Sequence, residues 1–133
     1  MRRSADFNSF RPPSADEKKL ISELTVAEFP GREEVIAQLE QFVVRPIDED
    51  GSLELHVTRA IAAPVLHRVP AELYGLDIDG VQISVLLHVV DGLCREVEIY
   101  KVDGTPIQRM PEVWQRFIPG AEEGDCDESV RRE

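Results

Sequence analysis

The chain has 133 residues and a formal net charge of −11, with 42% apolar and 31% charged residues. This length is too short for two ordinary hydrophobic cores, and the composition is typical of a globular domain. No apolar run approaches the roughly 20 residues of a membrane-spanning helix, and the first residues lack the apolar segment of a secretory signal. The two cysteines, Cys94 and Cys126, are too few for a disulfide scaffold. We therefore expect a single soluble cytoplasmic domain with free thiols.

The charge is unevenly distributed along the chain. Residues 14–110 carry nine Lys and Arg against eighteen Asp and Glu, a net charge of −9, and residues 111–133 carry three against seven, a net charge of −4. A surface of this sign disfavours direct binding to the phosphates of DNA or RNA and favours a basic protein partner. Acidity that serves only solubility explains the same numbers, so charge alone does not select between these interpretations.

Two short helices are expected near the N-terminus. Residues 1–13 have no apolar periodicity and are interpreted as a mobile arm, whereas residues 14–17, Ser-Ala-Asp-Glu, fit the capping-box pattern that begins a helix. Apolar residues then recur at the spacing of one helical face until Pro30-Gly31 interrupts them. A second helix is predicted over about residues 32–41, with two acidic residues in its first turn. Both helices are short, so we expect them to pack on a sheet.

The apolar spacing changes from 3.6 to 2 at residue 42. Residues 42–47 predict a strand at an edge of the sheet or one that ends near Pro46, because Pro46 cannot donate a backbone hydrogen bond. Residues 53–58 alternate as a half-buried strand does. Residues 60–70 are interpreted as a connector with a short strand. Three further strands are predicted over residues 73–78, 81–89 and 93–102.

Two Asp-Gly pairs separate the last three predicted strands, and a third pair follows the last of them. They occur at residues 79–80, 91–92 and 103–104, and such pairs predict hairpins because Gly adopts positive φ without a steric penalty. Three of these turns in series predict an antiparallel meander. At the middle turn, a three-residue loop places Val85 opposite Val97 and leaves one face free of most charges, so we expect this register.

The predicted register separates the side chains into two faces by parity. The inner face, which the helices cover, is predicted to consist of Val81, Ile83, Val85, Leu87, Val89, Val97 and Ile99. The opposite face is predicted to carry Ser84, Leu86, His88, Cys94, Glu96, Glu98 and Tyr100.

The C-terminal part begins at Pro111, a residue that favours the first position of a helix. We predict a short helical turn over residues 112–118, in which Trp114 and Phe117 dock against the sheet, and a disordered acidic tail over residues 119–133. The predicted fold class is therefore α+β: two short helices pack on one face of an antiparallel β-meander of about four to six strands. Residues 14–118 form the single domain.

The first candidate site combines His88 with Glu96 and Glu98. In the predicted register His88 and Glu96 are diagonal neighbours within side-chain reach. A histidine beside two carboxylates suits acid-base catalysis or a divalent metal, and His56 joins them if its strand lies adjacent. An ordinary polar cluster on a solvated face is the competing interpretation, so we assign no metal, no cofactor and no catalytic residue. The predicted binding face consists of Ser84, Leu86, His88, Glu96, Glu98 and Tyr100.

Two other patterns are weaker. Residues 48–51 and 77–80 both read Asp-x-Asp-Gly, as calcium loops begin, but the third acid and the terminal Glu are missing, so turn chemistry explains them. Cys94 faces His88 in the predicted register. However, the neighbouring Glu96 raises the pKa of a thiol, which disfavours a cysteine nucleophile.

The order of motifs in the second half of the chain carries a resemblance. Residues 74–80 form an acidic strand that ends in Asp-Gly, residues 86–92 an apolar strand with a second Asp-Gly, and residues 96–100 a Glu-x-Glu strand. Over about residues 14–110 the chain resembles small uncharacterised bacterial domains with this C-terminal meander. The resemblance implies the fold and transfers no catalytic residue. Some small acidic proteins of similar size are immunity partners of secreted toxins, so the resemblance also implies an immunity-like role.

These observations lead to one leading hypothesis and two alternatives. We expect a non-enzymatic module that binds a basic protein partner through its acidic surface, as an immunity or inhibitor protein does. The first alternative is a small hydrolase or isomerase that uses His88 with Glu96 or Glu98, and this requires a pocket around the trio. The second alternative is an acidic mimic of nucleic acid. The sequence leaves the identity of the partner and the oligomeric state open.

Overall fold

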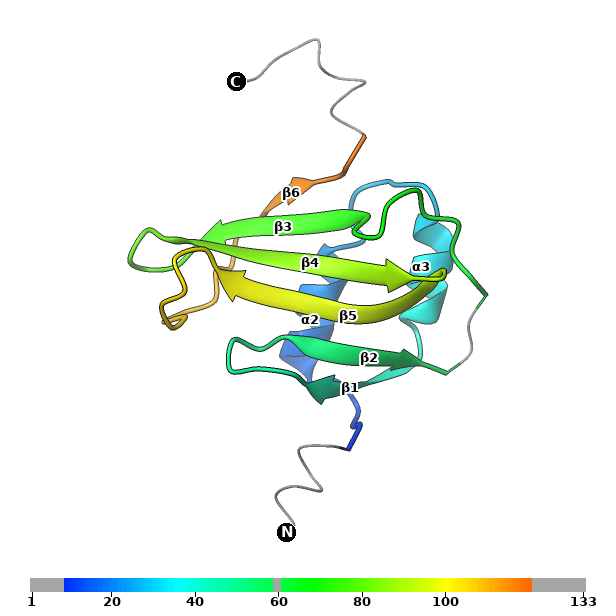
Figure 1. The fold of residues 1–133 in the computed structure, drawn as a ribbon, viewed down its shortest axis with the longest axis horizontal. Coiled ribbons are helices and arrows are strands. Elements are labelled where there is room, and N and C mark those ends of the chain that lie inside the picture. The colour runs from blue at the N-terminus through cyan, green and yellow to red at the C-terminus, as the bar shows by residue number, and fades with distance from the viewer. Residues whose placement is uncertain (1–8, 59–60, 121–133) are drawn as a thin grey trace.

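The structure is a computed structural model that describes residues 9–58 and 61–120. In this part of the chain it contains two helices and six strands, and every pair of neighbouring strands is antiparallel, which confirms the α+β class. The elements are α2 (Ala15–Glu23), α3 (Arg32–Gln38), β1 (Phe42–Pro46), β2 (Leu53–Val57), β3 (Ala71–Leu76), β4 (Gln82–Val90), β5 (Leu93–Lys101) and β6 (Gln115–Phe117). The strand order is β1-β2-β5-β4-β3-β6 (Figure 1).

Helix α2 begins with the predicted capping box. The Ser14 hydroxyl accepts a hydrogen bond from the Glu17 backbone N–H at 3.1 Å, and the Glu17 carboxylate accepts one from the Ser14 N–H at 2.8 Å. Helix α3 begins after Gly31, whose φ is 89°, and ends at Gln38, three residues before the predicted end. Neither helix in the described part of the chain has the length and apolarity that crossing a bilayer requires.

Both helices lie on the same side of the sheet (Figure 1). Their buried side chains Ile21, Leu24 and Val35 belong to one core with the inward side chains of the strands. The predicted inner residues Ile83, Val85, Leu87, Val89, Val97 and Ile99 are all at most 4% exposed. Val81 is the exception, because it precedes β4 and is only half buried. Parity therefore predicted the core side of the meander.

The predicted register of the β4–β5 hairpin is wrong. Val85 lies opposite Ile99 instead of Val97, and His88 lies opposite Glu96 instead of Cys94. The turn is a two-residue Asp91-Gly92 turn in which both φ values are positive, 55° and 80°. A bulge then inserts one extra residue into β5 between the Val89–Cys94 and His88–Glu96 pairs. This insertion keeps the glutamates off the inner face, which the two-residue turn alone does not achieve.

The meander continues through β3, β4 and β5, as predicted, but the third Asp-Gly turn does not extend it. After residues 103–104 the chain leaves the sheet, and β2 pairs with the free edge of β5 through Leu53–Val97 and Glu54–Glu96. None of residues 61–70 forms a strand, so the short strand predicted in the connector is wrong. A local turn signal does not specify which strand completes the sheet.

The helical turn predicted over residues 112–118 is also wrong. Gln115–Phe117 form β6, which pairs with Glu72–Tyr74 of β3. The unpaired backbone groups along the edge of β3 offer this segment hydrogen bonds that a one-turn helix cannot provide. Trp114 is half buried and packs against the core, as expected, whereas Phe117 belongs to β6 and lies opposite Glu72.

The other edge of the sheet is β1, and Pro46 is its last residue, so both positions that Pro46 left open are occupied. Residue Arg11 bridges to Val44 on this edge, with two backbone hydrogen bonds of 2.8 Å. Residues 9–13 of the predicted arm are thus held at the sheet edge. Residues 1–8 and 121–133, which include the rest of that arm and most of the predicted tail, lie outside the described residues.

Candidate functional site

The side chains that point away from the helices form a surface that we call the outer face. In Figure 1 this face is turned toward the viewer, and both helices lie behind it. The cross-strand pairs place the following residues on it: Arg45, Glu54, His56, Glu72, Tyr74, Leu76, Gln82, Ser84, Leu86, His88, Glu96, Glu98, Tyr100, Gln115 and Phe117. All members of the predicted binding face therefore share one side of the sheet. Ser84, however, is only 1% exposed and offers no surface.

Four glutamates gather on the central strands of the outer face. Glu54 lies opposite Glu96 on β5, and Glu98 and Glu72 flank Leu86 from its two sides. Like charges directly opposite each other destabilise a sheet, so this arrangement opposes folding unless cations reduce the repulsion between the carboxylates. Arg45 provides one such cation, since its guanidinium lies 2.7 Å from the Glu54 carboxylate. The centre of the face nevertheless carries more acidic than basic side chains.

His88, Glu96 and Glu98 come together as the sequence suggested. One ligand atom from each lies within 4.8 Å of the others. His88 Nε2 is 2.8 Å from Glu98 Oε1, and the Arg68 Nε–H donates to His88 Nδ1 at 3.2 Å. Because Nδ1 accepts, a neutral His88 carries its proton on Nε2 and donates it to Glu98. The Glu96 carboxylate makes no hydrogen bond or ion pair with another residue of the described part.

This arrangement limits the chemistry of the trio. The donor set of one imidazole and two carboxylates suits a divalent cation. A metal-bound histidine, however, usually donates from its second nitrogen, whereas here Arg68 donates toward His88 Nδ1. Both nitrogens of His88 are thus engaged in a polar network, and a general base or a metal has to displace one of these contacts. Glu96 is the open acceptor of the group.

Two other predicted partners of the trio lie elsewhere. The ring of His56 contacts Phe10, with the ring centroids 5.9 Å apart, and His56 is not part of the cluster. The two-residue turn places Cys94 on the inner side, opposite Val89, where it is fully buried. Burial raises the pKa of this thiol to about 12, so the thiolate needed for nucleophilic attack is disfavoured. The structure therefore does not support a Cys94–His88 pair.

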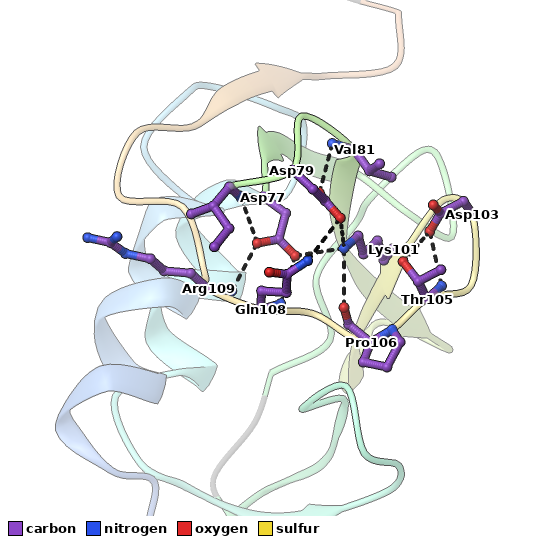
Figure 2. Close-up of polar contacts among 10 residues, drawn as sticks. Asp77, Asp79, Val81, Lys101, Asp103, Thr105, Pro106, Gln108 and Arg109 are labelled. Carbon is purple, nitrogen blue, oxygen red and sulfur yellow. Dashed lines mark hydrogen bonds and ion pairs between the residues drawn. The ribbon is translucent and has the colours of Figure 1, made fainter.

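A buried ionic cluster occupies the second of the two Asp-x-Asp-Gly sequences (Figure 2). The Lys101 ammonium lies 2.9 Å from the Asp77 carboxylate and 2.7 Å from the Asp79 carboxylate, and it donates to the Pro106 carbonyl at 3.2 Å. The side chains of Lys101 and Asp77 are both 0% exposed. Lys101 thus occupies the position between the carboxylates in which a calcium loop holds its cation.

Backbone groups complete the coordination of Asp77. Its carboxylate accepts hydrogen bonds from the N–H groups of Ile78, Gln108 and Arg109 at 2.7, 2.7 and 2.9 Å. Burial acts to raise the pKa of Asp77, but these hydrogen bonds and Lys101 outweigh it and lower the pKa to about 2. For Lys101, burial acts to lower the pKa, but the two carboxylates outweigh it and raise the pKa. The cluster is therefore ionised at neutral pH and ties residues 106–109 to the β3–β4 turn.

The sequence signal for this cluster is the position of Lys101 in its strand. Lys101 continues the alternation of the inward-pointing Val97 and Ile99, so its side chain is expected to be buried and to need carboxylate partners. The first Asp-x-Asp-Gly sequence behaves as turn chemistry predicts. The Asp48 carboxylate accepts from the N–H groups of Asp50 and Ser52 at 3.0 and 3.1 Å.

A hollow of about 580 Å³ lies at one corner of the outer face. Its lining combines outer-facing positions of β3, β4 and β6 with residues 109–113: Tyr74, Gly75, Leu76, Ile78, Gln82, Arg109, Met110, Pro111, Glu112, Val113 and Gln115. A second cavity of about 440 Å³ lies on the helix side, between α2, residues 50–51 and residues 110–114. No member of the His88 trio lines either cavity. Sequence reasoning missed the hollow because it assigned residues 112–118 to a helical turn.

The fold and its outer face define a small α+β domain in which both helices of the described residues lie on one side of the sheet. The family model described as Domain of unknown function (DUF6984) matches residues 10–111, and the chain belongs to this family. No curated protein and no solved structure matches the chain. The matched region includes both helices, β1 to β5 and the Asp77–Lys101 cluster. Family membership therefore agrees with the resemblance to uncharacterised domains, and the function rests on the site itself.

Proposed function

We propose that this protein is a small cytoplasmic protein-binding module whose outer face binds a basic surface of a partner protein. The observation that carries the proposal is the position of Glu54, Glu96 and Glu98 on adjacent strands, on the face of the sheet opposite to both helices of the described residues. An immunity or inhibitor protein, which masks the basic site of a toxin, is the kind of role that this surface suits.

The exposed carboxylates are arranged to receive arginine or lysine side chains. Glu96 has no partner among the described residues, and the Glu98 carboxylate is 39% exposed although it accepts from His88. An arginine that reaches Glu96 forms a charge-assisted hydrogen bond and relieves the repulsion between Glu96 and Glu54. Binding of this kind is fast and weakens as salt is added.

The open geometry favours binding over catalysis. A catalytic trio normally lies in a concave site, whereas both cavities noted above are lined by other residues. The engaged nitrogens of His88 argue in the same direction. A mimic of nucleic acid requires a continuous row of carboxylates, and here Arg45, His88 and Arg68 interrupt the row.

Variant-specific capture tests the proposal. The immobilised chain is incubated with extract of its source cells at low and high salt, and bound proteins are crosslinked and identified. We expect a protein that binds at low salt, is lost at high salt, and is lost with the triple variant Glu54→Gln, Glu96→Gln and Glu98→Gln.

The matched control removes three charges from the helix side. Glu33→Gln, Glu34→Gln and Glu40→Gln lie on or just after α3, and this variant is expected to capture the same protein as the natural chain. Equal loss with both triple variants means that net charge alone drives capture. Equal retention with both means that the outer face is not the binding site. Either result refutes the proposal.

A further inference from the structure

The outer face has an apolar corner beside its acidic centre. Leu76 and Ile78 are each 63% exposed and Val113 is 82% exposed, and all three line the hollow. Val102 is 52% exposed, and its N–H donates to the carbonyl of Gln82, another lining residue. Exposed apolar side chains that gather around a concavity and are bordered by polar groups are typical of interaction sites. The volume of about 580 Å³ falls within the roughly 300–1,000 Å³ typical of ligand sites.

The wall of the hollow is held in place by buried contacts. Asp77 accepts from the backbone of Gln108 and Arg109, so the chain enters the wall from a fixed position (Figure 2). Pro111 then lies directly over Gly75: a Cβ added to Gly75 meets the Pro111 ring at 2.6 Å. Because the wall is anchored before a ligand binds, less ordering entropy is lost on binding.

The acidic centre and the hollow are separated by a distance that one short segment spans. Glu98 and Glu72 both lie opposite Leu86, and Leu76 lies four residues along β3 from Glu72. Two strand spacings are about 10 Å and four residues of rise are about 13 Å, so Glu98 and Leu76 are about 16 Å apart. An extended segment covers this distance with about five residues.

We propose that the hollow receives an apolar side chain from the basic segment of the partner, while an arginine or lysine about five residues away pairs with Glu98. This inference rests on the proposed function and specifies the chemistry of the partner. The charge of the acidic centre selects a basic segment, and the exposed Leu76, Ile78 and Val113 select an apolar anchor within it. The side chain enters the hollow and covers apolar surface that is otherwise wet.

A displayed library of random 12-residue peptides is the probe. It is selected against the immobilised full chain at low salt, and enriched peptides are synthesised and measured by calorimetry. We expect enriched peptides to combine a basic residue with a large apolar residue about five positions away. Replacement of that apolar residue by Ala is expected to weaken binding about tenfold to a hundredfold.

Variants of the chain locate the two contacts. Leu76→Ser and Val113→Ser change exposed side chains and leave the core intact, and each is expected to weaken peptide binding about tenfold. Val26→Ser is the matched control, because Val26 is also 58% exposed but follows α2 on the helix side. This control is expected to bind like the natural chain. A double-mutant cycle between the peptide base and Glu98→Gln is expected to be non-additive.

The outcomes separate this inference from the proposed function. One outcome is the enrichment of basic peptides without an apolar anchor. If Leu76→Ser leaves their affinity unchanged while Glu96→Gln and Glu98→Gln abolish binding, the inference is overturned and the proposed function stands. If the affinity of the enriched peptides is unchanged by Leu76→Ser and Val113→Ser and also by Glu96→Gln and Glu98→Gln, both the inference and the proposed function are overturned. Failure to enrich any peptide also overturns the inference. If sedimentation shows that the chain is a dimer and that Leu76→Ser dissociates it, the hollow binds a second copy of the chain, and the inference is overturned.

Discussion

Gln38 offers a sharp test of how the β4–β5 hairpin is held. This residue is 1% exposed, and its side-chain amide donates to the carbonyls of Ile61 and Gly92 at 2.9 and 2.8 Å, while its oxygen accepts from the Cys94 N–H at 2.9 Å. In a Gln38→Met variant the Gly92 carbonyl still accepts the hydrogen bond from the Ala63 N–H, which is 2.8 Å long in the natural chain. The carbonyl of Ile61, an exposed residue, is hydrated by solvent. The buried Cys94 N–H loses its partner, which costs about 1–3 kcal/mol.

The expected loss of unfolding free energy is therefore about 2 kcal/mol, or a fall in Tm of about 8 °C for a domain of this size. Urea unfolding followed by circular dichroism measures it. Gln41→Met, at an exposed position, is the matched control and is expected to change stability by less than about 0.5 kcal/mol. If Gln38→Met is as stable as the control, the amide does not hold the hairpin, and the reasoning fails. Gln38→Glu is expected to destabilise as well, because a carboxylate cannot donate to the two carbonyls.

Three further predictions concern buried groups. Gly75→Ala places a Cβ 2.6 Å from the Pro111 ring, so we expect a loss of about 1–3 kcal/mol in urea unfolding, and an unchanged stability contradicts the packing. Asp77 has its pKa lowered from 3.8 to about 2, so its ionised contacts stabilise the fold above pH 3.8 and lose this effect as the pH falls toward 2. The stability gap between the natural chain and Asp77→Asn is thus expected to narrow over this window, and a constant gap counts against the assignment. In a Cys126→Ser background, the buried Cys94 thiol is expected to resist iodoacetamide at pH 8 until urea unfolds the chain, as mass spectrometry reports.

Local patterns in the sequence predicted features that depend on near neighbours. The capping box at residues 14–17, the edge position of the strand with Pro46, and the inward parity of β4 all follow from groups a few residues apart. The candidate trio was also predicted, because both the predicted register and the observed one beyond the bulge place His88, Glu96 and Glu98 on the same side of the sheet.

The pairing of distant segments was decided only by the tertiary structure. The bulge in β5 places His88 directly opposite Glu96, and it exists because the two-residue turn and the apolar inner face are satisfied together only with one extra residue. The pairing of β6 with β3 overrides the helical signal of Pro111, since the edge of β3 supplies hydrogen bonds that a short helix lacks.

Alternation along each strand, helix starts and turn chemistry were determined by the sequence itself, because each depends on groups that are covalently close. The hollow, the Asp77–Lys101 cluster and the clamp at Gln38 were decided by the tertiary structure. Each of them joins segments at least 22 residues apart, as between Asp79 and Lys101, and local propensity carries no information about which distant groups satisfy each other.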